Sequence, residues 1–229
     1  MTSPTDTPLV PTIGDLNSPI WLLGDSPSTT KHIEELEPKI EPLDRRHPTR
    51  HTIWTPILDV FQRHLYKRCG RRLDDSKLYI QNAIIEFKDE NKTKRIKDGV
   101  ENVNKLLEYT PKPFLVLCFG QFTFECARRA NNENPQSQKH WSIPELSQEF
   151  SQRISKVQLD SMGSVTLLPL LHQSAALQFW KCNGNPRIWG GNYFEYVGEK
   201  IADVLICNLT NERINELLLP VKPKDTTFE

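Results

Sequence analysis

Three polar side chains, Asp25, Asn82 and His172, lie where apolar runs of this sequence end. Asp25 follows the letters LLG, Asn82 lies within YIQNAI, and His172 follows LLPLL. In an open α/β sheet, ligands bind outside the carboxyl ends of the strands. A carboxylate, a carboxamide and an imidazole from three separate segments therefore form a candidate ligand site.

Each of the three residues also has a simpler explanation, and these explanations stay open at this point. Asp25 is a residue type that caps helices well, and Ser174 can cap a helix directly after His172. Asn82 can be a buried strand amide bonded to backbone, and His172 a loop histidine whose hydrogen bonds are satisfied. The three strand ends would be without function only if the simpler explanation were true for each of the three residues.

The elements that must position these residues follow from the hydrophobic pattern. Short runs rich in Val, Ile and Leu, mostly bounded by turn signals, predict buried strands. They alternate with segments of helical periodicity, and such alternation predicts a mostly parallel sheet covered on both faces, in an α/β protein. The strands are expected at 19–24, 78–85, 113–120 and 164–171, the helices at 54–69, 96–109, 120–130 and 192–207, and a polar surface loop at 130–144.

The composition is that of an ordinary soluble protein. The 229 residues carry no formal net charge, and 37% of them are hydrophobic, so one α/β domain is the simplest organisation. No apolar run approaches the roughly 20 residues of a membrane helix. The N-terminus lacks the basic start and apolar core of a signal peptide, so a cytoplasmic location without a membrane partner is expected. The five cysteines are odd in number and never spaced C-x-x-C, which argues against a disulfide framework or a cysteine-held metal.

Basic residues are concentrated between Arg45 and Arg72. Eight Lys or Arg side chains lie there against one acid, Asp59. A local basic cluster on a balanced chain is what contact with phosphate requires. For the half from Arg63 to Arg72, a solvated helix face is an equally good interpretation. The half that contains Arg45, Arg46 and Arg50 is the predicted DNA-binding part.

The order of four motifs resembles the uracil-DNA glycosylase superfamily. The motifs are LLGDSPS, YIQNAI, PFLVLCFGQFTFECA and LLPLLHQSAAL, and the match spans about residues 19–206. Each motif is weak alone, whereas the ordered set is fairly specific. The resemblance implies a three-layer α/β/α sandwich around a four-stranded parallel sheet. We therefore expect a leader at 1–18, a glycosylase-like domain at 19–219 and a tail at 220–229.

The resemblance also implies roles for individual residues. Asp25 matches the acidic position that stabilises a cationic sugar and orients a water, and His172 donates a hydrogen bond to the leaving base. Asn82 reads a base that has left the stack. Ser174 is expected to hold phosphate, and Leu177, Phe179 or Trp180 to fill the vacated gap as an apolar wedge. The expected partner is double- or single-stranded DNA, bound by a monomer without cofactor or metal.

The sequence departs from the family pattern at several positions. The histidine loop reads His-Gln-Ser, without the usual proline, and the four cysteines of the branch with an iron–sulfur cluster are absent. In the family, one stretch supplies a phenylalanine that stacks on uracil. The corresponding stretch here reads RRHPTRHTIW and contains no phenylalanine, so Trp54 or a histidine is the candidate substitute. Ser28 stands where strict uracil enzymes place a bulky aromatic residue. The basic stretch 92–98 lacks the histidine of a DNA-crosslinking branch, so that trapping chemistry is not expected.

These observations predict a monofunctional DNA glycosylase that removes uracil or a C5-modified pyrimidine. Asn82 can pair with uracil or, with its amide rotated, with cytosine, so it does not choose between them. Ser28 leaves room at the C5 edge. The role is either base-excision repair or defence against phage DNA with modified bases. The alternative is a nucleic-acid-binding module that kept the fold and lost the chemistry, whereas a nucleotide hydrolase lacks support because no P-loop or dinucleotide glycine pattern is present.

Overall fold

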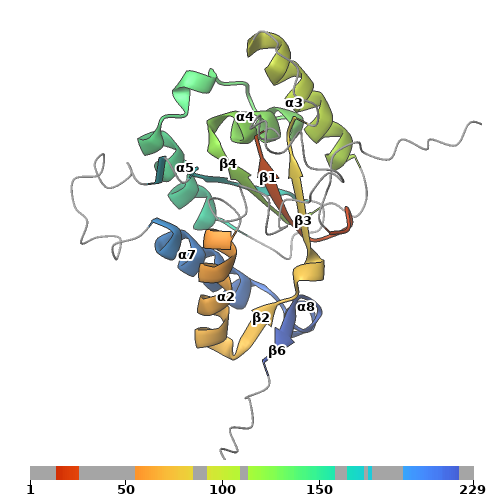
Figure 1. Cartoon of the computed structure of the whole chain (residues 1–229), viewed down its shortest axis with the longest axis vertical. Helices are drawn as coiled ribbons and strands as arrows, with labels where there is room; N and C mark the ends of the chain where they lie inside the picture. Colours follow the sequence, from red (N-terminus) through yellow and green to blue (C-terminus); the bar gives the residue numbers. More distant parts are fainter. Residues whose placement is uncertain are drawn as a thin grey trace, which may run out of the picture.

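The computed structural model of this chain contains a four-stranded parallel sheet flanked by helices (Figure 1). Its strand order is β3-β1-β4-β5, and every neighbouring pair is parallel. The predicted fold class, an α/β/α sandwich around a four-stranded parallel sheet, is therefore confirmed. The strands are β1 (Ile20–Gly24), β3 (Leu78–Asn82), β4 (Leu115–Phe119) and β5 (Thr166–Leu170). The structure describes residues 14–25, 55–84, 92–108, 113–157, 164–172, 175–176 and 193–221.

The strands form where the sequence is apolar because both faces of the sheet are covered. Every residue of β1 and β4 is buried, which is typical of a parallel sheet between two helical layers. Trp21 of β1 packs against Tyr79 of β3 with ring centroids 5.2 Å apart. The Trp21 indole Nε1–H donates to the carbonyl of Ser18 at 2.8 Å, so this buried tryptophan leaves no donor unpaired.

The helices pack in pairs around this sheet. Helix α2 (Thr55–Cys69) packs against α7 (Tyr193–Asn208), and α3 (Lys92–Leu107) packs against α4 (Gly120–Ala130). Helix α5 (Ile143–Ile154) packs on β5. None of the helices within the described ranges is long and apolar enough to cross a membrane.

Several elements were not predicted from the sequence. Helix α5 begins at the end of the expected 130–144 loop, which also contains the short 3-10 helix η3 (Gln138–His140). A second, antiparallel sheet joins β2 (Arg71–Leu73) to β6 (Leu218–Pro220). Strands of three residues are too short to show a hydrophobic period, so the pattern carried no signal for them. The remaining short helices are η2 (Asp75–Lys77) and α8 (Asn211–Leu217).

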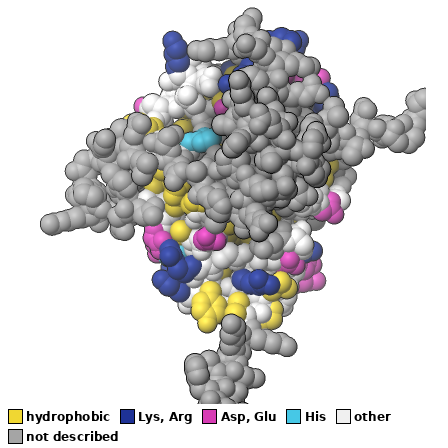
Figure 2. All heavy atoms as spheres, in the orientation of Figure 1, with side chains coloured by type: hydrophobic (Ala, Val, Ile, Leu, Met, Phe, Trp, Pro, Cys, Tyr) yellow, Lys and Arg dark blue, Asp and Glu magenta, His cyan; other side chains and the backbone are white. Residues whose placement is uncertain are grey.

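The basic residues from Arg63 to Arg72 interact largely with the protein itself. Arg63 forms an ion pair with Glu195 of α7, and Arg68 pairs with Asp203 of the same helix at 2.7 Å. On the face drawn in Figure 2, basic and acidic side chains lie side by side over the part of the molecule that contains α2 and α7. Arg63 and Arg68 are thus ion-paired on the surface of α2, and Arg71, in β2, donates to the Asn215 side chain at 2.8 Å. The other half, with Arg45, Arg46 and Arg50, lies outside the described residues.

Candidate functional site

The carboxyl ends of the four parallel strands lie at one edge of the sheet. The strand order places Asn82, Asp25, Gly120 and His172 next to one another along this edge. In register, Asn82 is the partner of Gly24, directly before Asp25, and Phe119 is the partner of Leu170, shortly before His172. The structure thus brings the three predicted polar residues to the same edge.

A cavity of about 540 Å³ opens beside Asp25 and His172. The first turn of α4 and the segment from η3 to the start of α5 both line this cavity. Asn82 is not among the described residues that line this cavity, although it lies at the same sheet edge. The lining residues include Asp25, Gly120, Gln121, Phe122, Gln138, Trp141, Ser142, Ile143, Leu171, His172 and Ala175.

Asp25 is held at the sheet edge by its backbone and by an ion pair. The β1–β3 pairing continues beyond the strands, because the N–H of Ile84 donates to the Asp25 carbonyl at 2.9 Å. The Arg95 guanidinium Nη2 lies 2.5 Å from the Asp25 carboxylate Oδ1. Burial raises the pKa of the Asp25 carboxyl, and the positive charges of Arg95 and of His172 in its protonated form oppose this rise only in part. Asp25 is therefore a carboxylate that takes up a proton more readily than an ordinary aspartate.

His172 packs against a glycine that begins α4. Gly120 has a φ of +88°, and a Cβ at this position would lie 3.2 Å from the His172 Cδ2. A residue with a side chain would be strained here and would also press on the imidazole. Burial lowers the pKa of His172, and the negative charge of Asp25 offsets this only in part. The imidazole is therefore neutral at neutral pH.

The strand end that carries His172 is anchored to α7 by a buried tyrosine. The N–H of Leu171 donates to the Tyr193 hydroxyl oxygen at 2.8 Å, and both residues are buried. Burial raises the pKa of the Tyr193 phenol, so the phenol is protonated at neutral pH. The contact fixes the backbone immediately before His172.

We expect Tyr193→Phe to lower the free energy of unfolding by about 1–3 kcal/mol, because it leaves a buried N–H without its acceptor. Urea denaturation measures the change. The exposed Tyr66 provides a matched control, and Tyr66→Phe should change stability by less than about 0.5 kcal/mol. Equal stabilities of the two variants would mean that the Leu171 N–H finds another acceptor.

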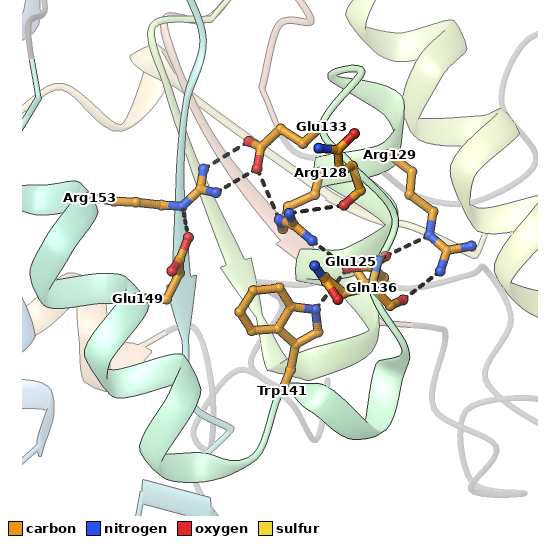
Figure 3. Close-up of polar contacts among 9 residues, drawn as sticks. Glu125, Arg128, Arg129, Glu133, Gln136, Trp141, Glu149 and Arg153 are labelled. Carbon is orange, nitrogen blue, oxygen red and sulfur yellow. Dashed lines mark hydrogen bonds and ion pairs between the residues drawn. The ribbon is translucent and has the colours of Figure 1, made fainter.

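A buried carboxylate, Glu125 of α4, binds Trp141, which is one of the residues that line the cavity (Figure 3). It accepts hydrogen bonds from the Trp141 indole Nε1 at 2.7 Å and from the Gln136 backbone N–H at 2.7 Å. Arg128 and Arg129 donate to it from the next turn of the same helix at 2.9 and 2.6 Å. Burial alone would raise the pKa of Glu125, but these hydrogen bonds together lower it. The loop that carries Trp141 is therefore tied to α4 by charge-assisted bonds.

The same network extends to α5. Glu133 accepts hydrogen bonds from Arg128 at 2.9 Å and from Arg153 at 2.6 and 2.9 Å, and Arg153 also donates to Glu149 at 2.7 Å (Figure 3). The Arg128 guanidinium lies over the Trp141 ring, 4.8 Å from its centroid. The positions of α4, the η3 segment and α5 relative to one another are thus set by paired charges.

Asn82 lies at the end of β3 in a partly exposed position. Its backbone N–H donates to the side-chain Oε1 of its neighbour Gln81 at 3.0 Å. Asn102 of α3 donates to the Ala83 carbonyl at 3.2 Å, which holds the chain directly after Asn82. The backbone at Asn82 is therefore well fixed. Its role in reading a base stays a prediction.

The other predicted site residues lie outside the described residues. They are Ser28, Trp54, Ser174, Leu177, Arg45, Arg46 and Arg50. Sequence reasoning did not single out Arg95, Glu125 or Trp141. Arg95 belongs to the basic stretch 92–98, where nothing in the sequence distinguishes it from the neighbouring basic residues. Trp141 lies in a polar loop, where neither a hydrophobic period nor a known motif indicates that it belongs to a site.

Neither the models of known protein families nor the curated proteins contain a match to this chain.

Proposed function

We propose that this protein is a monofunctional DNA glycosylase that hydrolyses the N-glycosidic bond of uracil or of a C5-modified pyrimidine. The observation that carries the proposal is the placement of Asp25 and His172 at one cavity on the carboxyl edge of the sheet. A half-buried carboxylate and a neutral imidazole are the two groups that this reaction needs. The order of motifs in the sequence supports the same assignment.

Asp25 acts on the sugar. Departure of the base leaves positive charge on the deoxyribose, and a carboxylate beside it stabilises that charge and orients the attacking water. Only the ionised form does both. Since burial raises the pKa of Asp25, activity should fall with decreasing pH at a higher pH than for an ordinary aspartate. Arg95 limits this rise by its positive charge.

His172 acts on the base. The leaving pyrimidine takes the electron pair of the glycosidic bond and becomes an anion. A neutral imidazole donates a hydrogen bond to an oxygen of that anion as the charge develops, and no full proton transfer is needed. The lowered pKa of His172 keeps the imidazole in this neutral form. Gly120 and Tyr193 support the proposal because they fix the ring and the backbone before it.

The cavity receives the flipped base. Its volume of about 540 Å³ is in the range of sites that hold whole small-molecule ligands, so it has room for a pyrimidine with a substituent at C5. Phe122 and Trp141 supply aromatic surface to the cavity. They offer a stacking surface for the base in a protein whose stretch 45–54 contains no phenylalanine. Asn82, at the adjacent strand end, pairs with the polar edge of the base.

A panel of labelled oligonucleotides tests the proposal. Each single- or double-stranded DNA holds one base, namely uracil, thymine, cytosine, 5-hydroxymethyluracil or 5-hydroxymethylcytosine, and abasic sites are scored after alkaline cleavage. We expect cleavage at uracil, at a C5-substituted pyrimidine, or at both. DNA binding without cleavage of any member would favour the binding module that has lost its chemistry. Cleavage at uracil alone would favour base-excision repair, and cleavage at a modified cytosine would favour defence against phage DNA.

We expect His172→Ala to slow base release most for the bases that are the poorest leaving groups. A donor to the departing base contributes more when the base holds its negative charge badly. Single-turnover rates on two or more substrates of different leaving-group pKa measure the effect, and His172→Gln, which keeps a donor, is the matched variant. An equal slowing of all substrates would assign His172 to positioning of the DNA.

A further inference from the structure

Arg95 of α3 contacts two residues of the candidate site at once. Its guanidinium Nη2 lies 2.5 Å from the Asp25 Oδ1, and its Cζ lies 4.5 Å from the centroid of the Phe122 ring. Phe122 is buried and lines the cavity, so the guanidinium is held between the carboxylate and an aromatic wall. The Arg95 side chain is itself only 35% exposed, which strengthens both interactions relative to a surface pair.

The position of α3 explains why this contact forms. Gly99 lies one turn after Arg95 on the same face of the helix. A Cβ at Gly99 would lie 2.8 Å from the Cys126 Sγ and 3.1 Å from the Phe122 Cζ, both in α4. The absence of a side chain at Gly99 therefore lets α3 approach α4 closely. This approach brings Arg95 over Phe122 and within reach of Asp25.

Charged and titratable groups face Asp25 from three directions in the described part of the chain. Arg95 approaches from α3, His172 from the loop after β5, and Cys126 from α4. Burial raises the pKa of the Cys126 thiol strongly, so it is neutral. His172 is neutral at neutral pH. The positive charge that faces Asp25 at neutral pH is therefore that of Arg95.

We propose that Arg95 is a positioning residue that keeps the Asp25 carboxylate ionised and fixed at the wall of the cavity. This inference rests on the proposed function, because Asp25 must be ionised to act on the sugar. Arg95 itself need not touch the base or the deoxyribose. It acts through Asp25, and Phe122 holds the guanidinium in place while the carboxylate works.

The variant Arg95→Met tests this role because it keeps much of the side-chain volume and removes the charge. Without the guanidinium, the pKa of Asp25 should rise further, since the charge of Arg95 lowers it in the native protein. Single-turnover excision should then be slowed most at low pH and should approach the native rate at high pH. Arg95→Lys should return the acid limb of the profile toward its native position. The control Lys97→Met removes one exposed charge from the same helix and should leave the profile unchanged.

A second measurement reads Asp25 without any turnover. Carboxyl ¹³C NMR of protein labelled at aspartate follows the protonation of Asp25, whose signal is assigned by its loss in Asp25→Asn. The Asp25 midpoint should lie at higher pH in Arg95→Met than in the native protein or in Lys97→Met. An unchanged midpoint would overturn the inference, even if the enzyme were active. A raised midpoint in a protein that cleaves no DNA would support the role of Arg95 and contradict the proposed function, so the two failures are distinguishable.

Discussion

Asp25→Asn is expected to slow base excision by on the order of a hundredfold or more and to leave DNA affinity unchanged, as is typical when one positioned transition-state group is lost. The asparagine keeps the size of the side chain but removes the negative charge that stabilises the cationic sugar and orients the water. It also removes the ion pair with Arg95. Single-turnover rates and equilibrium DNA binding, measured on the same oligonucleotide, separate the two effects.

The matched control is Asp59→Asn on α2. Asp59 is exposed and does not line the cavity, so its substitution changes the net charge equally and should leave the excision rate unaltered. If Asp25→Asn excises at the native rate, Asp25 has no part in the mechanism. If the two variants lose activity together, the effect comes from the net charge of the protein.

Glu125→Ala is expected to lower the free energy of unfolding by about 3–5 kcal/mol, which is typical when one partner of a buried charge network is removed. Glu125 is fully buried and accepts hydrogen bonds from two arginines, from the Trp141 indole and from the Gln136 backbone. Its loss leaves these donors without their acceptor. Arg128 then keeps only one of its two carboxylate partners, Glu133. Urea denaturation measures the change.

Glu149→Ala serves as the control for this prediction. Glu149 pairs with Arg153 within α5 but is partly exposed, and such pairs contribute about 0–1 kcal/mol. A loss in Glu125→Ala no larger than in Glu149→Ala would mean that water or other groups satisfy the network after substitution. Because Glu125 holds Trp141 at the cavity wall, the folded fraction of Glu125→Ala should also excise more slowly than the native protein.

The sheet and the edge that carries the candidate site could be predicted from local sequence. The strands that end near Asp25, Asn82 and His172 are apolar runs of about the right length for buried strands, and their polar ends mark the carboxyl edge. Parallel topology follows from the helices between them. The expected end of the second strand, at residue 85, was too late by three residues, because Ala83 and Ile84 are buried and apolar yet follow the end of β3.

The walls of the cavity could not be predicted because they depend on contacts between distant segments. Arg95 and Asp25 are separated by 70 residues, and nothing in a basic stretch indicates which of its members turns inward. Trp141 lines the cavity, and its indole N–H donates to Glu125, which lies 16 residues earlier in the chain. Such pairings arise when α3 and η3 pack onto α4, and neither the hydrophobic period nor residue spacing predicts this packing.

The neutral state of His172 and the raised pKa of Asp25 are likewise products of packing. Both shifts come mainly from burial, which is a property of the assembled edge. The residue types alone indicate a possible acid–base pair. Burial raises the pKa of Asp25 and lowers that of His172, and this burial is visible only in the folded protein, where both residues line one cavity.

The most direct test of the account is chemical analysis of what the protein releases from DNA. The native protein is incubated with each oligonucleotide of the panel, and free bases are quantified by liquid chromatography and mass spectrometry beside the abasic sites in the same reaction. We predict an intact free pyrimidine, with any C5 substituent still attached, in equal amount to the abasic sites, and none with Asp25→Asn. Native protein that binds these DNAs but releases no free base from any of them would contradict it.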